Sequence, residues 1–244
     1  MKWGAVDLSA DYDLTVRQRN PSLSLATDHV TAELRAWGFR STIQPARFAL
    51  DVLVTGSSIT DLEDNLSAIR GTLATMTDAE LRFDEYTDRY WNARFVSLTG
   101  TFRGPTAWVG QLELVCHDPA AYAETEDTDT DSATGDWSDT LTVGGTAYCY
   151  PVITLTASGA QNDITVTVRN DTLDMELSWS GSLANEDVLE FDSEAESVTL
   201  NDVSVMTGVS GDNPRWPLLK PGGNLIEISG FTGTVLITWR KRYL

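Results

Sequence analysis

Alternating apolar and polar residues predict strands in both halves of the chain. In the segment Arg47–Thr55, the apolar side chains of Phe48, Leu50, Val52 and Val54 fall on one face. Because successive side chains of a strand point to opposite faces, this pattern indicates a strand with one buried face. Other segments of the same kind predict further strands at Ala5–Leu8, Tyr12–Val16, Ser24–Thr31, Ala79–Asp84, Arg89–Thr101 and Trp108–Val115.

One segment of the first half has the period of a helix instead. Apolar residues recur at alternating three- and four-residue steps through Ser58–Met76, which places them in a single stripe. Ser58 is a suitable N-cap, and Asp61 three residues later is a weak capping-box match. The stripe is too short for a coiled coil, so we expect an amphipathic helix that covers one face of a sheet. The residues of the stripe are Ile59, Leu62, Leu66, Ile69, Leu73 and Met76.

Proline-containing segments mark the ends of several predicted strands. Val16–Pro21 and Arg103–Thr106 are predicted to form turns, because proline fixes its own backbone and cannot donate a hydrogen bond to a sheet. The stretch Gln111–Tyr122 begins as a strand and is stopped by His117–Pro119. We therefore expect this stretch to close the first folding unit.

The composition changes abruptly after Tyr122. The run Glu124–Asp139 is acidic and rich in Thr and Ser, and we interpret it as a solvated linker or an exposed loop. Beyond it, short predicted strands alternate with turn signals, as in a β-sandwich or barrel. The sequence thus predicts two domains, residues 1–122 and residues 123–244, with the acidic linker at 124–139. The strands predicted in the second domain are Pro151–Ala157, Asp163–Arg169, Met175–Trp179, Val188–Phe191, Val198–Leu200, and a hairpin of Asn224–Ser229 and Thr234–Arg240 around Gly230–Gly233.

The chain has a strong excess of carboxylates. Its 244 residues include 36 acidic and 17 basic side chains, which gives a formal net charge of −19, and the only lysines are Lys2, Lys220 and Lys241. This charge argues against nucleic-acid binding, which needs a basic surface. An acidic surface with few lysines is similar to that of proteins from haloarchaea and their viruses, where concentrated salt screens the repulsion between carboxylates. No apolar run is long enough to predict a membrane span, and Met1–Asp11 lacks the features of a signal peptide.

The two cysteines, Cys116 and Cys149, lie on either side of the acidic run. Their spacing permits a disulfide, although two buried free thiols are favoured for a protein that is assembled inside a cell. There is no second cysteine pair or histidine cluster to make a zinc site. His29 and His117 are the only histidines, and neither lies near a nucleophile motif. The sequence therefore predicts no catalytic, cofactor-binding or metal-binding residues, and no enzyme activity.

Three aspartates in the acidic run have the spacing at which a calcium loop begins. Asp127, Asp129 and Asp131 match its first positions. Ser132 and Ser138, however, stand where the loop needs its glycine and its bidentate glutamate. The run is therefore interpreted as solvated surface rather than as a calcium site.

Two further features leave a sugar-related function open. Glu190 and Asp192 are the residue types of a glycosidase pair, but in a chain this rich in carboxylates we interpret them as surface charge. Trp216 lies within Pro214–Asn224, which is expected to be a proline-fixed connection between two strands. An exposed indole at this position would stack on a sugar ring, so the alternative function is a carbohydrate-binding module that recognises host-surface glycans.

Four segments, in chain order, resemble the distal tail proteins (the Dit family) of long-tailed viruses with non-contractile tails. They are LELVCHDPAAY at 112–122, GTAYCYP at 145–151, PRWPLLKPGGNLIEISG at 214–230 and GTVLITWRKRYL at 233–244. The helix predicted at Ser58–Met76 lies where the first domain of the family has one. The first forty residues match the family pattern poorly.

The resemblance implies a mainly β protein with two domains. The first would be a β-sandwich with one helix that forms a homohexameric ring, and the second a galectin-like β-sandwich. Such a ring is the hub at the virion tail tip that connects the tail tube protein to the baseplate hub, the tail-associated proteins and the receptor-binding proteins, after assembly in the host cytoplasm. The resemblance implies a structural protein without a cofactor, and the word galectin-like describes a fold rather than sugar binding.

Overall fold

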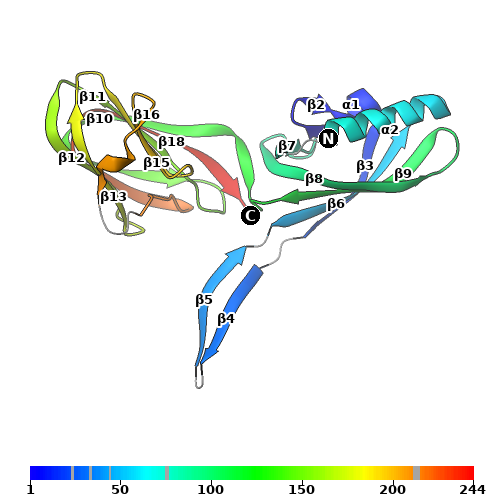
Figure 1. Ribbon diagram of the computed structural model, residues 1–244, viewed down its shortest axis with the longest axis horizontal. Helices are drawn as coiled ribbons and strands as arrows, with labels where there is room; N and C mark the ends of the chain where they lie inside the picture. Colours follow the sequence, from blue (N-terminus) through cyan, green and yellow to red (C-terminus); the bar gives the residue numbers. More distant parts are fainter. Residues whose placement is uncertain (23–24, 33–34, 44, 75–76, 211–214) are drawn as a thin grey trace. The chain divides into compact units, whose positions relative to one another are not determined.

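The computed structural model (Figure 1) describes residues 1–22, 25–32, 35–43, 45–74, 77–210 and 215–244. For the described residues between 18 and 43 it gives the backbone alone. The chain divides into two compact units, Met1–Glu124 (unit 1) and Thr125–Leu244 (unit 2). Each unit has its own hydrophobic core and is built mainly from antiparallel strands, so the predicted mainly β fold class is confirmed.

The strands of unit 1 are β1 (Lys2–Trp3), β2 (Val6–Asp7), β3 (Leu14–Ser22), β4 (Leu25–Ala32), β5 (Arg35–Ile43), β6 (Ala46–Thr55), β7 (Ala79–Arg82), β8 (Arg89–Phe102), β9 (Ala107–Cys116) and the start of β10 (Ala121–Val143). Its main sheet has the order β3–β6–β9–β8. β8 also enters a second sheet, in which it pairs with β7 and with Tyr122 and Ala123 of β10, while β7 pairs with β1 and β1 with β2. Phe48, Leu50 and Val52 of β6 are buried, as their alternation predicts.

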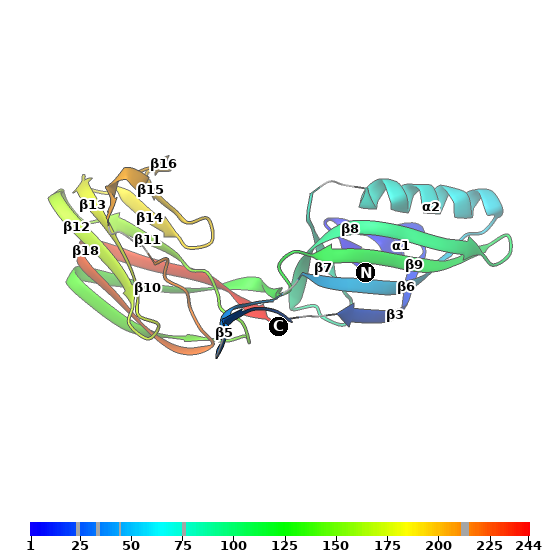
Figure 2. The same ribbon diagram turned by 60° about the horizontal axis from the view of Figure 1, so that its bottom comes forward.

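Helix α2 (Ile59–Leu73) covers one face of the main sheet (Figure 2). It begins as predicted, because the Ser58 hydroxyl accepts a hydrogen bond from the Asp61 backbone N–H at 3.2 Å. Ile59 at the start of the predicted stripe is 52% exposed, and Met76 at its end lies outside the described residues. The buried residues of the stripe are Leu62, Leu66, Ile69 and Leu73.

A short helix, α1 (Leu8–Tyr12), stands where parts of two strands were predicted, so the predictions of strands at Ala5–Leu8 and Tyr12–Val16 are wrong at these residues. The Asp7 carboxylate caps the helix by accepting hydrogen bonds from two backbone N–H groups of its first turn, at 3.1 and 3.2 Å. Asp13 ends it in the left-handed conformation. A single turn held by its own caps leaves little hydrophobic period, which explains the error.

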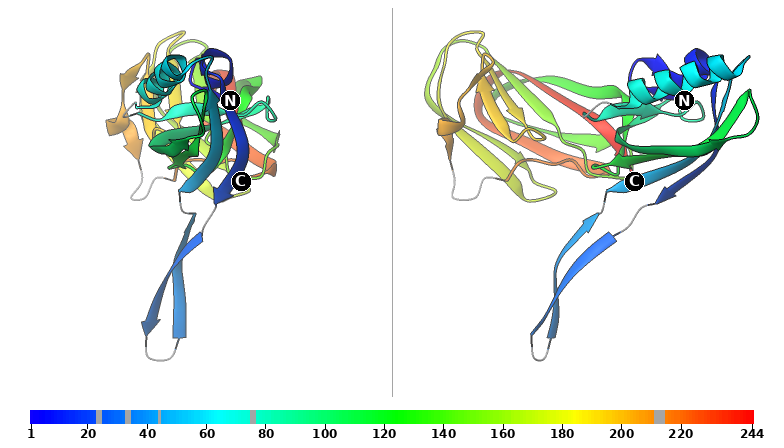
Figure 3. Two further views of the ribbon diagram at one scale, coloured as in Figure 1. Left: turned by 90° about the vertical axis from the view of Figure 1, so that its right-hand side faces the viewer. Right: turned by 45° about the vertical axis from the view of Figure 1, so that its right-hand side comes forward.

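The turn predicted at Val16–Pro21 is also wrong, because β3 continues through Pro21, which lies opposite Phe48 of β6. In the described part of the chain β3 pairs on one side only, and such edge strands tolerate proline. The turn predicted at Arg103–Thr106 is confirmed, since the Arg103 N–H donates to the Ala107 carbonyl at 2.7 Å. The strand predicted at Ser24–Thr31 corresponds to β4, which pairs with β5 and with no other described strand (Figure 3).

Unit 2 contains two antiparallel sheets. Its elements, besides the rest of β10, are β11 (Val152–Ala157), β12 (Gln161–Asn170), β13 (Met175–Leu183), β14 (Val188–Asp192), β15 (Ser197–Leu200), β16 (Val203–Ser204), the 3₁₀ turn η1 (Met206–Gly208), β17 (Val209–Ser210) and β18 (Gly222–Tyr243). One sheet has the order β16–β15–β14–β11–β18 and the other β17–β13–β12–β18. Each strand predicted from the sequence of the second half is present.

β18 belongs to both sheets because it turns back at Gly230–Gly233, as the hairpin prediction requires. Ile228 before the turn lies opposite Val168 of β12, and Val235 after it lies opposite Leu155 of β11. These four side chains are buried in one cluster, the core of unit 2.

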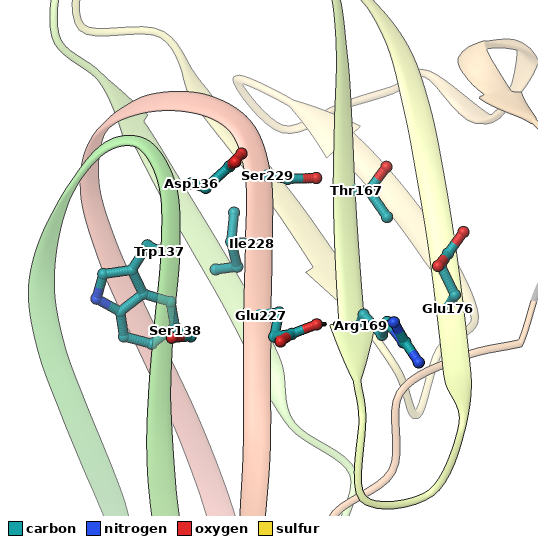
Figure 4. Close-up of a pocket in the computed structure, with 9 residues that line it drawn as sticks. All are labelled: Asp136, Trp137, Ser138, Thr167, Arg169, Glu176, Glu227, Ile228 and Ser229. Atoms are coloured by element: carbon teal, nitrogen blue, oxygen red, sulfur yellow. Dashed lines mark ion pairs between the residues drawn. The ribbon is translucent and has the colours of Figure 1, made fainter.

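The acidic linker predicted at Glu124–Asp139 is wrong, because these residues lie in β10, which pairs with β18. Ala133 and Trp137 are buried there, whereas most carboxylates of the run face solvent. Gly135 has a φ of 100°, and Figure 4 shows β10 doubling back as a hairpin. A strand whose solvent side is acidic and whose buried residues are this sparse has the composition of a loop, which explains the error.

Candidate functional site

The residue types that suggested chemistry do not assemble into a catalytic group in the described structure. Cys116 is fully buried at the end of β9, whereas the next residue, His117, is exposed. Burial, with smaller effects of Asp118 and Asp78, raises the pKa of the Cys116 thiol to about 12. Such a thiol is neutral at physiological pH and is a poor nucleophile. His29 lies in β4, for which the structure gives the backbone alone.

Both cysteines are free and buried, so the prediction of two buried free thiols is confirmed. Burial also raises the pKa of the Cys149 thiol.

The three aspartates of the possible calcium loop have separate roles on β10. Asp127 pairs with the Lys241 ammonium at 3.0 Å, and Asp131 accepts a hydrogen bond from the Trp137 indole at 2.9 Å. That hydrogen bond lowers the pKa of Asp131, whereas burial raises the pKa of Asp129. No group of three His, Cys, Asp or Glu side chains in the described part of the chain is arranged to hold a metal ion.

The acidic pair on β14 is accounted for by local structure. Asp192 accepts hydrogen bonds from the backbone N–H groups of Glu194 and Ala195, both at 2.9 Å, and so shapes the turn after the strand. Glu190 lies within 3.4 Å of the Thr154 hydroxyl on the neighbouring strand. These contacts support the interpretation as surface charge.

Trp216 is partly buried and packs against the core of unit 2, so it does not present an open platform. The connection that contains it is fastened by two buried amides. Asn170 donates to the Leu218 carbonyl at 2.6 Å, and Asn224 bonds the backbone N–H and carbonyl of Lys220 at 2.9 and 2.8 Å. The proline-rich segment is therefore a structural connection, as its simplest interpretation predicted.

Unit 1 leaves one face of its main sheet uncovered. We call this the open face, and none of its described side chains is buried, whereas the alternate residues of the same strands lie beneath α2 or in the core. Ser97 and Glu113 are hydrogen-bonded across it at 3.2 Å. A hollow of about 630 Å³ on this face lies beside Arg17, Asp51 and Gln111. The open face consists of Arg47, Ala49, Asp51, Leu53, Thr55, Arg94, Ser97, Thr99, Thr101, Ala107, Val109, Gln111, Glu113 and Val115.

Unit 2 carries a polar pocket of about 350 Å³ on the outer face of the β12–β13 sheet (Figure 4). Its residues come from four strands, β10, β12, β13 and β18. Arg169 is the one basic residue among those that line it, and its guanidinium pairs with Asp171 at 2.7 Å and with Glu227 at 3.8 Å. The residues that line the pocket are Asp136, Trp137, Ser138, Thr167, Arg169, Glu176, Glu227, Ile228 and Ser229.

The pattern of the sequence does not predict this pocket. Its residues are spread over nearly a hundred positions, and, apart from Trp137 and Ile228, each alone has the appearance of a solvent-facing strand residue. Alternation shows that Thr167 and Arg169 share a face, but only the pairing of β12 with β13 and β18 brings Glu176 and Glu227 beside them.

None of the helices in the described part of the chain has the length and the apolar composition of a membrane span.

Known protein families and solved structures resemble this architecture. No curated protein sequence matches the chain. Residues 144–243, most of unit 2, match the family model of the siphovirus-type tail component, C-terminal domain.

Among solved structures, the Dit (gp 19.1) protein of phage SPP1, described as a paradigm of the hub adsorption apparatus in phages that infect Gram-positive bacteria, superposes with a TM-score of 0.81. The match covers 99% of this chain and 98% of that one at 18% identity, so it shows a common fold. Chains of the activated phage P2 baseplate with Ca and with Sr match less closely, with TM-scores of 0.51 and 0.50 at 7% and 8% identity, over 95% of this chain and 91% and 92% of theirs. Residues 144–243 of unit 2 therefore match the C-terminal domain of siphovirus-type tail components, the whole chain has the fold of the SPP1 Dit protein, and the resemblance to distal tail proteins is confirmed.

Proposed function

We propose that this chain is a distal tail protein that forms a homohexameric hub ring at the tip of a viral tail. In this proposal the ring joins the tail tube protein to the baseplate hub and to the tail-associated and receptor-binding proteins. The observation that carries the proposal is a fold shared with a hub protein over 99% of the chain, together with the tail-component match of unit 2. The role is structural and requires no catalysis.

Within the ring, we assign assembly to unit 1 and outward projection to unit 2, a galectin-like sandwich. The open face of unit 1 supports this assignment. It carries Leu53, Val109 and Val115, partly buried, among charged and hydroxyl side chains. Interfaces between subunits commonly combine apolar and polar groups in this way.

The hairpin β4–β5 also supports assembly. A two-stranded hairpin alone is marginally stable in water, and in the described part of the chain no third strand pairs with this one. A neighbouring copy in a ring would supply the missing partner surface.

Replacing residues 25–43 by a short Gly/Ser turn tests this step. We expect the variant to keep the folded units and to sediment as a single chain, whereas the intact protein sediments as a ring. A variant that assembles as well as the intact protein would exclude the hairpin from assembly.

The position in the virion is tested by labelling. Antibodies against unit 2 are expected to mark the tail tip of intact particles in electron micrographs. Labelling along the tail shaft, on the head, or on no part of the particle would contradict the hub proposal.

The carbohydrate-binding alternative receives no support from the residue that suggested it. Trp216 packs against the core, so its replacement by alanine is expected to destabilise unit 2 rather than to abolish a stacking contact.

A further inference from the structure

The pocket of unit 2 brings hydroxyl, carboxylate and guanidinium groups together in one hollow. We propose that it binds a neutral oligosaccharide through Arg169 and the carboxylates around it. This inference goes beyond the hub function and does not depend on it, because a hub ring without sugar binding would leave the proposed assembly intact.

Hydrogen-bonding groups are concentrated on one sheet face at the pocket. Beside the pocket, Thr165 pairs with Ser180 and Thr167 with Ser178, each through hydroxyls 2.9 Å apart. Ser138 and Ser229 add hydroxyls from β10 and β18. A surface that alternates donors and acceptors in this way matches the hydroxyl groups of a sugar.

The guanidinium of Arg169 is held in place by its ion pairs. Arg169 is 38% exposed, and its ion pairs with Asp171 and Glu227, and more distantly with Asp174 at 3.8 Å, hold it over the sheet. A guanidinium has five N–H donors, so these partners leave donors for a ligand in the pocket. A pre-positioned polar group costs less entropy on binding than a mobile one.

The mixed charge of the pocket favours a neutral ligand. Asp136, Glu176 and Glu227 line the pocket with Arg169, so an anionic ligand meets an excess of carboxylates. A cationic ligand meets the guanidinium in the same space. Sugar hydroxyls satisfy both signs, because they donate to carboxylates and accept from guanidinium.

The size of the pocket agrees with a short segment of sugar. Its volume of about 350 Å³ lies at the lower end of the range for ligand sites, about 300–1,000 Å³. The Trp137 indole, whose N–H is held by Asp131 at 2.9 Å, forms part of the wall on β10 (Figure 4).

The test is an array that carries neutral oligosaccharides beside sialylated and sulfated ones, probed with the full-length protein at low and at molar salt. We expect neutral oligosaccharides to bind at both salt concentrations, since no net charge is neutralised on binding. Arg169→Gln and Glu227→Gln are expected to weaken that binding at least tenfold. Arg103→Gln and Glu194→Gln, matched changes at exposed positions outside the pocket, are expected to leave it unchanged.

The proposal is overturned if no neutral oligosaccharide binds, if only the acidic ones bind, or if the pocket variants bind like the unchanged protein. A hexa-arginine peptide tests the competing occupant, a basic protein segment. If that peptide binds and is lost with Glu227→Gln but not with Glu194→Gln, while the neutral oligosaccharides do not bind, the pocket belongs to a basic partner and the sugar proposal fails.

Discussion

The two units use the same alternating strands to build different surfaces. Unit 1 buries one face of its main sheet beneath α2 and leaves the other open, whereas unit 2 packs two sheets against each other and keeps its core between them. Their charges also differ, since unit 1 has 17 acidic and 11 basic residues and unit 2 has 19 acidic and 6 basic. Under the proposed function, the less acidic unit with the open face makes the contacts between copies, and the more acidic unit with the closed core faces solvent.

The difference between the two units requires that their cores unfold independently. Phe231 is fully buried in the core of unit 2, and Leu66 is buried in that of unit 1. Phe231→Ala is expected to lower the unfolding free energy of unit 2 by about 3–5 kcal/mol, and Leu66→Ala that of unit 1 by about 2–5 kcal/mol, because each leaves a cavity. Hydrogen exchange measured by mass spectrometry should show each loss in one unit only. Equal loss of protection in both units would show one cooperative fold and contradict the division.

Each unit contains one cysteine, which makes the thiols separate reporters. Burial raises the pKa of Cys116 from 9.0 to about 12, so at pH 8 its thiolate population is roughly a thousandfold smaller than that of a free cysteine. The raised pKa contributes stability below pH 9 that is lost as pH rises from 9 toward 12. Iodoacetamide is expected to leave Cys116 and Cys149 unmodified until their own units unfold. Rapid alkylation of either thiol in the folded protein would show that its core is open.

Glycine substitutions test how tightly the main sheet of unit 1 is packed. A Cβ at Gly110 would lie 2.2 Å from the Trp108 ring and 2.3 Å from the Thr99 carbonyl oxygen. We expect Gly110→Ala to destabilise unit 1 by about 1–3 kcal/mol through overpacking. Gly71 in α2 has open space around it, so Gly71→Ala is the matched control and is expected to stabilise unit 1 by about 0.5–1 kcal/mol. Thermal unfolding distinguishes the two, and equal effects would show that the sheet is not packed as described.

The dependence of stability on salt concentration tests the difference in charge between the two units. It is the smallest effect that we expect. The Debye length grows from about 3 Å at 1 M salt to about 30 Å at 0.01 M, so dilution lets the carboxylates of unit 2 repel one another over longer distances. We expect the unfolding midpoint of unit 2 to fall more than that of unit 1 on dilution. Converting the exposed residues Glu194, Glu196 and Asp202 to their amides should reduce that fall. A larger fall for unit 1 would contradict the argument from charge.

Most of the strand pattern could be predicted from the sequence, because alternation over several residues survives the details of packing. β6, with Phe48 to Val54 buried at every second position, and the hairpin of β18 are examples. The errors lie where local chemistry replaces hydrophobic period. Asp7 caps a helix of one turn, Pro21 is accommodated at a sheet edge, and β10 has few buried anchors.

The pocket of unit 2 could not be predicted in the same way. Arg169, Glu176 and Glu227 lie on three strands, and their meeting depends on register, which a single sequence does not reveal. Trp216, which the sequence left open as an alternative sugar contact, packs against the core of unit 2.

Ring assembly is measured most simply by the mass of the purified full-length protein in native mass spectrometry, together with sedimentation in molar salt. We expect a closed assembly with six times the mass of one chain. A strict monomer at high protein concentration and molar salt would contradict it.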